Sequence, residues 1–147
     1  MSALVIDASI AVKWLIAEAD APEARALRQR GRCMAPDLLI VQGAQILWKK
    51  VRRGELSAKE AHFAARLLQG IDMELVPTRP LLDATMRLAL ELDHPPYDCI
   101  YLALALAAEC RLVTVDSVLL GKLARAEREA LRGVVISLAD AAEAIGT

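Results

Sequence analysis

The sequence predicts an α/β domain in which a central parallel sheet of four to five short strands carries helices on both faces. Two short apolar runs, residues 4–6 and 112–115, are typical of strands that a sheet buries on both sides. Segments with helical periodicity separate the strand-like runs, and this alternation indicates parallel strands joined by helices. At 147 residues the chain suits one domain, which we expect to span residues 1–147.

The first half of the chain is expected to form one strand and four helices. Pro22 in a first turn and Gly31 after a basic tail bound the second helix. Ser57 and Glu60, three residues apart, form a capping box for the fourth helix. Residues 34–37 are interpreted as a helix breaker and cap. The expected ranges are 4–6 for the strand and 8–19, 22–31, 38–51 and 57–70 for the helices.

The second half alternates strands with helices. Its longest apolar helix, over residues 97–108, has almost no polar face, so we expect it to be packed on both sides. The other expected ranges are 73–76, 111–116 and 133–137 for strands, and 81–92, 119–129 and 138 onward for helices. In the helix over 81–92, the residues expected to form the buried stripe are Met86, Leu88, Ala89 and Leu92.

Composition and charge exclude several classes of protein. The formal net charge is -1, so overall electrostatics do not indicate a nucleic-acid binder, and RNA would need a local basic patch. The three cysteines, Cys33, Cys99 and Cys110, fit no metal-ligand spacing, and the first residues lack the basic region that leads into a signal sequence. No apolar run approaches the ~20 residues that a membrane-spanning helix needs. We therefore expect a soluble, cytoplasmic protein without a membrane segment.

Three aspartates are expected to converge although they are far apart in the sequence. Asp7 and Asp116 each follow a strand-like run, and parallel neighbouring strands would place both carboxylates at one edge of the sheet. Asp98 lies in the first turn of the apolar helix that precedes the second strand. Such a helix runs antiparallel to the next strand, so its amino end lies over the same edge.

Crowded carboxylates favour a cation between them, because without a counter-ion some of them would take up protons. Oxygen ligands without a neighbouring histidine or cysteine suit Mg²⁺ or Mn²⁺ better than Zn²⁺. A metal site of this kind supports hydrolysis of phosphodiesters. For each residue alone the alternative is structural, with Asp98 capping a helix and Asp116 beginning a turn. For the three together we favour the metal site.

Several motifs, in their order and spacing, resemble those of the PIN-domain ribonucleases, and among them the VapC-type toxins of bacterial toxin–antitoxin pairs. The resemblance covers nearly the whole chain. The segments that carry it are Val5-Ile6-Asp7-Ala8-Ser9 with Lys13-Trp14, Ala35-Pro36-Asp37-Leu38-Leu39, Leu47-Trp48-Lys49-Lys50, Arg52-Arg53-Gly54-Glu55-Leu56, Tyr97-Asp98-Cys99-Ile100-Tyr101-Leu102-Ala103-Leu104-Ala105 and Leu112-Val113-Thr114-Val115-Asp116.

The resemblance implies a PIN-like fold and a metal-dependent endoribonuclease, the toxin of a type II pair. Its metal-binding acids fall on Asp7, Asp98 and Asp116, with Mg²⁺ or Mn²⁺ as the cofactor. Ser9 and Thr114 match small polar positions that support the site in the family. The implied partners are an RNA substrate, a cognate antitoxin and a second copy of the chain in a homodimer.

The family's remaining site position does not match. In the helix after the Pro-Asp-Leu-Leu segment, where the family usually has a glutamate, this sequence has Gln42. The amide oxygen of Gln42 could still bind a cation, but the residue brings no charge and cannot act as a base. We therefore predict weaker metal binding and slower hydrolysis than in a Gln42→Glu variant. The alternative is a catalytically impaired module that binds RNA or an antitoxin without efficient cleavage.

Other polar residues have weaker functional interpretations. Lys13 lies one to two turns beyond Asp7 and is a candidate RNA contact, as is the basic run 49–53, which could equally be a solvated helix end. His62 and His94 receive no role. A receiver-like signalling domain would need an acidic pair at the first strand and a further aspartate on a middle strand, and the sequence contains neither.

Overall fold

A sheet of five parallel strands forms the centre of the computed structural model, which describes residues 3–146 apart from the side chain of Arg30. The strand order is β3-β2-β1-β4-β5, and every neighbouring pair is parallel. The strands are β1 Ala3–Ile6, β2 Arg32–Pro36, β3 Glu74–Val76, β4 Arg111–Thr114 and β5 Val135–Ser137. The predicted α/β class with a parallel sheet is therefore confirmed.

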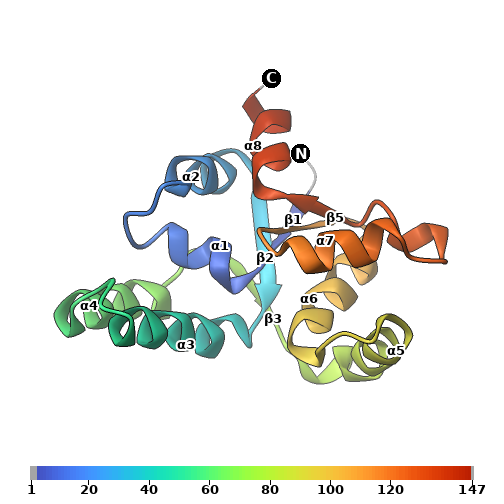
Figure 1. The fold of residues 1–147 in the computed structure, drawn as a ribbon, viewed down its shortest axis with the longest axis horizontal. Helices are drawn as coiled ribbons and strands as arrows, with labels where there is room; N and C mark the ends of the chain where they lie inside the picture. The colour runs from blue at the N-terminus through green and yellow to red at the C-terminus, as the bar shows by residue number, and fades with distance from the viewer. Residues whose placement is uncertain (1–2, 147) are drawn as a thin grey trace.

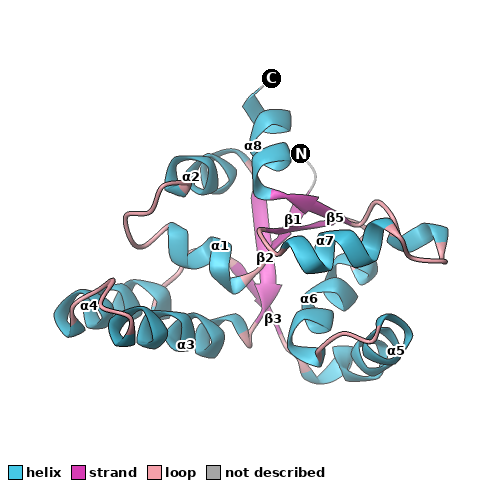
Figure 2. Cartoon of the chain, viewed as in Figure 1, coloured by secondary structure: helices cyan, strands magenta, loops and turns pink. Residues whose placement is uncertain are grey.

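Helices connect the strands and cover the sheet (Figure 2). They are α1 Ala8–Lys13, α2 Ala21–Arg30, α3 Leu39–Arg52, α4 Ala58–Gln69, α5 Leu82–Leu92, α6 Pro96–Ala107, α7 Ser117–Ala124 and α8 Leu138–Gly146, with 3₁₀ turns at Arg79–Leu81 and Glu129–Leu131. The capping box at the start of α4 forms as predicted, with both reciprocal bonds between Ser57 and Glu60. Within the described residues, no helix is long and apolar enough to cross a membrane.

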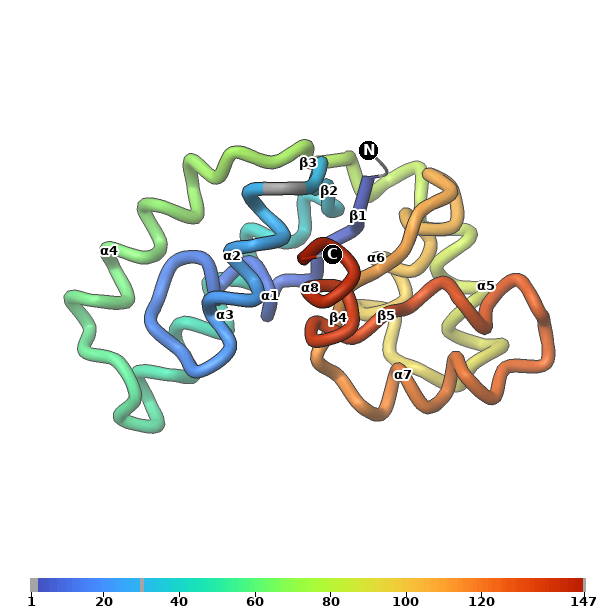
Figure 3. Tube along the Cα trace, turned by 90° about the horizontal axis from the view of Figure 1, so that it is seen from above, coloured from blue at the N-terminus to red at the C-terminus, as the bar shows by residue number. Residues whose placement is uncertain are grey.

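The two faces of the sheet are covered by different helices. Helix α6 packs on β1, β2 and β4, and α5 packs against α6 from outside, on the right in Figure 1. On the other side, α1 contacts β4 and α2 contacts β2. Helix α8 packs against α2 (Figures 1 and 3). Helices α3 and α4 pair with each other, and α3 leans against α1. The site described below lies where α1, α3, α6 and α7 meet the carboxyl ends of β1 and β4.

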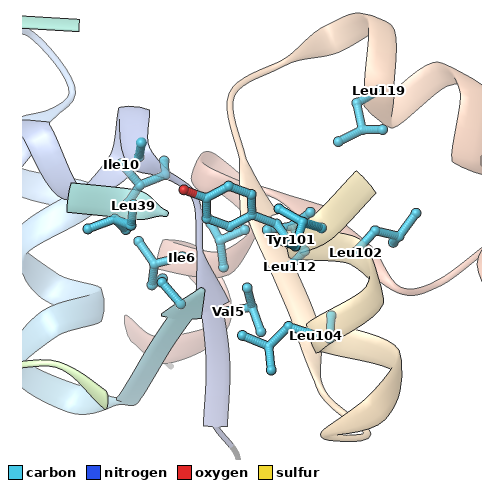
Figure 4. Packing of buried hydrophobic residues seen from close by; sticks show 14 of the residues in the cluster. Val5, Ile6, Ile10, Leu39, Tyr101, Leu102, Leu104, Leu112 and Leu119 are labelled. Atoms are coloured by element: carbon cyan, nitrogen blue, oxygen red, sulfur yellow. The ribbon is translucent and has the colours of Figure 1, made fainter. Parts of the chain in front are cut away.

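Aliphatic packing holds the centre of the sheet in place. Val5 and Ile6 of β1 are fully buried, as expected for a central strand covered on both faces. Figure 4 shows Leu102 and Leu104 of α6 packed around Val5 and Leu112. Burying each such side chain stabilises the fold by about 1.5–3 kcal/mol relative to exposure. The strand ends that carry the polar residues are therefore fixed by a rigid core.

Strand β2 was missed by the sequence prediction, which interpreted residues 34–37 as a breaker and cap. The proline that suggested a breaker, Pro36, is the last residue of the strand, where a missing N–H is tolerated. The next residue continues the pairing, since the backbone N–H of Asp37 donates to the carbonyl of Val76 at 2.8 Å. Strand β2 lies between β1 and β3 and is buried at its carboxyl end.

Some predicted helix limits and one predicted core residue were also wrong. Helix α1 ends at Lys13 instead of near residue 19, because the backbone N–H of Trp14 closes a tight turn to Ala11. Helix α7 ends at Ala124, several residues earlier than predicted. Met86 is 43% exposed, because the face of α5 turned to the core carries Thr85, Leu88 and Ala89.

Candidate metal centre

Asp7 follows directly after β1 and caps the amino terminus of α1. Its Oδ1 accepts the backbone N–H of Ile10 at 3.0 Å and the hydroxyl of Ser9 at 2.6 Å. Burial raises the pKa of Asp7 above its ordinary value, and the nearby charge of Asp98 raises it further, while bonds from Ser9, Thr114 and Ile10 lower it. The carboxylate is thus held by local donors in a place that disfavours its charge.

Asp116 occupies the matching position after β4 and caps α7. Its Oδ1 accepts two backbone N–H groups, from Val118 at 2.9 Å and Leu119 at 3.2 Å. The backbone N–H of Asp116 donates to the hydroxyl of Thr114 at 3.0 Å. Local bonds alone therefore fix both the backbone and the side chain of this residue.

Thr114 joins the two strand ends. In the parallel register of β1 and β4, Ile6 is opposite Val113, so Asp7 and Thr114 follow at the same level. The Thr114 hydroxyl is a partner of the Asp7 carboxylate and also accepts from the N–H of Asp116. Thr114 is 1% exposed, so water does not compete for these bonds.

Asp98 reaches the same edge from the opposite layer. It lies in the first turn of α6, which packs on β1 and β4. Its Oδ2 is 2.8 Å from Nε2 of His94, four residues earlier in the loop between α5 and α6. Because the Asp98 charge raises the pKa of Asp7, the two carboxylates lie close enough to repel each other.

His94 is a site residue that the sequence prediction missed. It is buried, and one ligand atom from each of His94, Asp98 and Asp116 lies within 4.8 Å of the others. The available signal was only its place close before Asp98, in the segment that leads into the apolar helix. The two prolines that follow His94, Pro95 and Pro96, led us to interpret it as an ordinary turn residue.

Gln42 faces the cavity from α3 and bonds with a second missed residue, Tyr101. The Tyr101 hydroxyl donates to Oε1 of Gln42. In Figure 4 the ring of Tyr101 lies among the core side chains and its hydroxyl is turned toward the helix that carries Leu39, which is α3. Burial, Asp7 and Asp98 all raise the pKa of Tyr101, so it remains a protonated donor.

Apart from His94, these residues line one cavity of about 780 Å³ at the carboxyl edge of the sheet. All of the predicted acids and support residues belong to its lining, namely Asp7, Ser9, Gln42, Asp98, Thr114 and Asp116. Tyr97 and Lys49 also contribute to the wall, and both are exposed to solvent. The cavity can therefore admit a ligand between an acidic floor and a wall with a cation.

Lys13, the predicted RNA contact, points elsewhere. It is buried, and its Nζ lies 3.0 Å from Asp20 and 3.6 Å from Glu18. Glu18 also pairs with Lys50 of α3 at 3.2 Å, so these charges tie the segment after α1 to α3. Lys13 is not among the residues that line the cavity. Among the basic residues described, Lys49 is the one that lines it.

The chemistry of the cavity fits a hard divalent cation. Three carboxylates line the cavity, and burial, with a smaller contribution from the charge of Asp98, raises the pKa of Asp7, so the site disfavours the charge of that carboxylate without a counter-ion. Oxygen donors of this kind suit Mg²⁺ or Mn²⁺. Asp7, Asp98 and Asp116 are the residues that could hold the ion, with Gln42 offering at most a neutral oxygen.

Comparison with known proteins gives consistent results. A family model described as the PIN domain matches residues 4–140. No curated protein matches the sequence. Among solved structures, the crystal structure of PAE2754 from Pyrobaculum aerophilum is similar, with a TM-score of 0.72 and 21% sequence identity. That match covers 99% of this chain and 90% of the other, and at this identity it shows a shared fold.

Proposed function

Because the chain belongs to the PIN-domain family, we propose that it is a metal-dependent endoribonuclease and the toxin of a type II toxin–antitoxin pair. PIN domains are generally nucleases that act on RNA with divalent metals, so membership itself indicates a hydrolase. The observation that carries the proposal is the meeting of Asp7, Asp98 and Asp116 in one cavity. Asp7 follows β1, Asp98 lies in α6 and Asp116 follows β4, so three separate elements bring the carboxylates to this cavity.

Each residue of the cavity has a separate task in this proposal. Asp7, Asp98 and Asp116 would hold Mg²⁺ or Mn²⁺. The bound ion would neutralise charge on the phosphodiester and lower the pKa of a water molecule. Ser9 and Thr114 hold the carboxylate of Asp7 in one orientation through their hydroxyls.

Lys49 supplies positive charge beside the acids and is placed to contact the RNA backbone. Tyr97, an exposed ring in the same wall, could stack on an unpaired base. Lys49 belongs to the basic run 49–53 that the sequence already suggested as an RNA contact, and with Tyr97 it takes this role in place of Lys13.

Gln42 makes this site weaker than one with four acids. Its Oε1 already accepts the Tyr101 hydroxyl, and an amide can neither take a proton nor add charge. We expect Gln42→Glu to bind Mn²⁺ more tightly and to cleave RNA faster than the wild type. If neither the Mn²⁺ affinity nor the cleavage rate changes, Gln42 does not weaken the site, and this part of the proposal is wrong.

The same residue supports a second candidate function, a module that binds RNA or an antitoxin with little cleavage. A site lacking one of its usual charges could hold a substrate and still turn it over slowly. The two functions differ in one measurement, the rate of RNA cleavage with saturating Mn²⁺.

Exposed apolar side chains support the proposed protein partners. On α3 and α4 these are Val41, Trp48, Phe63 and Leu67, and on α5 they are Leu82, Met86 and Leu90. An antitoxin and a second copy of the chain are the partners that we propose for such surfaces. Trp48 is 53% exposed, so it is available to a partner and does not belong to the core.

Cleavage of a structured RNA with unpaired loops, with Mg²⁺, with Mn²⁺ and with a chelator, tests the proposal. Wild type should cut only with metal, and Asp7→Asn should lose more than about 100-fold, since even outer partners of metal ligands are worth 10- to 100-fold. Asp37→Asn is the matched control, because Asp37 is exposed and outside the cavity lining. Cleavage that persists in Asp7→Asn, or that needs no metal, would contradict the proposal.

A further inference from the structure

Hydrogen bonds of its own backbone and of the preceding residue hold His94 in place behind the site. Its backbone N–H donates to the carbonyl of Ala89 at the end of α5, and its own carbonyl accepts the thiol of Cys99 on α6. The preceding residue, Asp93, has the left-handed backbone of a helix end, and its carbonyl accepts Nζ of Lys122 on α7 at 2.6 Å. The segment is therefore tied to the two helices that carry Asp98 and Asp116.

The side chain of His94 has one partnered and one unpartnered nitrogen. Nε2 lies 2.8 Å from Oδ2 of Asp98, and the buried Nδ1 has no partner among the residues that the structure describes. A purely structural position could be filled by an apolar side chain without leaving a buried polar atom unsatisfied. The bond to Asp98 is thus the feature that distinguishes histidine from leucine here.

The unpartnered nitrogen also decides which nitrogen carries the proton. A proton on Nδ1 would be a buried N–H without an acceptor, which is costlier than a bare ring nitrogen, because orphaned buried N–H groups are rarer than unpaired acceptors. The proton therefore sits on Nε2, and His94 donates to Asp98. A nitrogen that carries this proton has no lone pair for a metal ion.

This argument separates two uses of the cluster formed by His94, Asp98 and Asp116. Distances alone would allow the imidazole to bind a cation as a third ligand. A metal-binding imidazole needs a partner for its other nitrogen, and Nδ1 has none. His94 also lies outside the cavity lining, whereas both aspartates line it. The observations therefore favour His94 as a hydrogen-bond donor to Asp98 over His94 as a ligand of the metal ion.

We propose that His94 is a positioning residue, whose Nε2–H fixes one oxygen of Asp98 and leaves the other oxygen for the cation. This inference rests on the proposed metal-dependent function and adds a residue to it. Metal-binding side chains are generally oriented by such outer hydrogen bonds, and their loss costs about 10- to 100-fold in metal affinity.

Titration of tag-free protein with Mn²⁺, followed by the electron paramagnetic resonance signal of the free ion, tests the proposal without using activity. His94→Leu removes the donor and should weaken Mn²⁺ binding by about 10- to 100-fold. His94→Gln places an amide N–H near the former Nε2 and should bind within a few-fold of wild type. His94→Asn is polar but too short to reach Asp98, so it should resemble His94→Leu, and it serves if the leucine variant does not fold.

The only other histidine, His62, provides the matched control, because it is exposed on α4. His62→Leu should leave Mn²⁺ affinity unchanged. Pulsed resonance of the Mn²⁺-loaded wild type should show no directly bound nitrogen. A nitrogen signal that disappears in the His94 variants and persists in His62→Leu would make His94 a ligand and overturn the positioning role. Equal affinity in wild type and His94→Asn would overturn it too.

The failure of this inference and of the proposed function can be told apart. If Mn²⁺ binding depends on His94 as expected but the protein cuts no RNA, the positioning role is supported and the nuclease function is contradicted. If the protein cuts RNA with metal but its His94→Leu and His94→Asn variants bind Mn²⁺ as tightly as the wild type, the nuclease function is supported and the positioning role is contradicted. Wild type that binds no Mn²⁺ overturns both.

Discussion

Two strand–aspartate–helix junctions stand side by side in this molecule and use similar local sequence in different ways. At β1–α1 the Asp7 carboxylate accepts one backbone N–H and the hydroxyl of Ser9, and at β4–α7 the Asp116 carboxylate accepts two backbone N–H groups. Both residues cap the helix that follows. Taken alone, each junction has the ordinary geometry of an aspartate that caps a helix.

The difference between the junctions lies in what surrounds them. Asp7 faces Asp98 and the hydroxyl of Thr114, and burial raises its pKa. Asp116 is satisfied by its own helix, and its backbone is fixed by the same Thr114 hydroxyl. Helix capping is thus a sufficient structural reason for an aspartate at position 116. At position 7 capping does not explain why the fold keeps a carboxylate whose charge burial disfavours. The fold tolerates this cost at the residue that we propose as a metal ligand.

Thr114→Val should produce the largest change in stability, because it removes the hydroxyl that both junctions share. The N–H of Asp116 would lose its acceptor and Asp7 one of its donors, at a cost of about 1–3 kcal/mol. Urea unfolding of the metal-free protein measures this loss. Thr114→Ser keeps the hydroxyl and should lose clearly less. Equal losses in the two variants would mean that the methyl group, and not the shared bond, matters at this position.

The sequence was sufficient to predict the edge of the sheet at which the acids meet. Apolar runs ending at Asp7 and Asp116, with a helix beginning near Asp98, can be arranged in few ways once the strands are parallel. The PIN-like fold predicted from the motifs is confirmed by the family match and by the five-stranded parallel sheet. The parallel sheet and its edge follow from periodicity and from chain direction, both of which are local in the sequence, whereas the PIN-like fold was implied by the resemblance of the motifs.

The parts that the sequence prediction missed depend on tertiary contacts. Strand β2 is made a strand by pairing with β1 and β3, which overrides the weak preference of its Cys-Met-Ala-Pro sequence. Lys13 follows Asp7 closely in the chain, but Asp20 and Glu18 turn it away from the cavity. His94 and Tyr101 acquire their importance only from partners on other elements or across a loop. No spacing rule ranks such residues above ordinary core positions.

Asp116→Ala should have a smaller effect than Thr114→Val, because it removes only a helix cap. Losing an aspartate at an N-cap costs about 1 kcal/mol. Asp116→Asn keeps an acceptor oxygen and should lose less, mainly the interaction of the charge with the helix dipole, about 0.3–1 kcal/mol. Urea unfolding without metal provides both values. An alanine variant as stable as the wild type would show that the two bonds to α7 contribute little.

Asp7→Asn should give the smallest change in stability, and in the opposite direction. Asparagine caps helices as well as aspartate, so the bonds to α1 can be kept. The substitution removes a charge that burial and Asp98 disfavour, and the gain is limited because Ser9, Thr114 and Ile10 already offset part of that cost. The metal-free variant should therefore melt slightly higher than the wild type at neutral pH.

The pH dependence of this gain follows from the direction of the shift. The pKa of Asp7 is raised in the folded protein above its ordinary value of 3.8, so the wild type loses stability as the pH rises from 3.8 through the raised value. The difference in melting temperature between metal-free Asp7→Asn and wild type should be largest at neutral pH and should vanish as the pH falls toward 3.8. Adding Mn²⁺ should reverse it, because the ion stabilises only the protein that binds it. A metal-free Asp7→Asn variant that melts lower than wild type at neutral pH would show that the Asp7 charge stabilises its junction, and the contrast with Asp116 would then disappear.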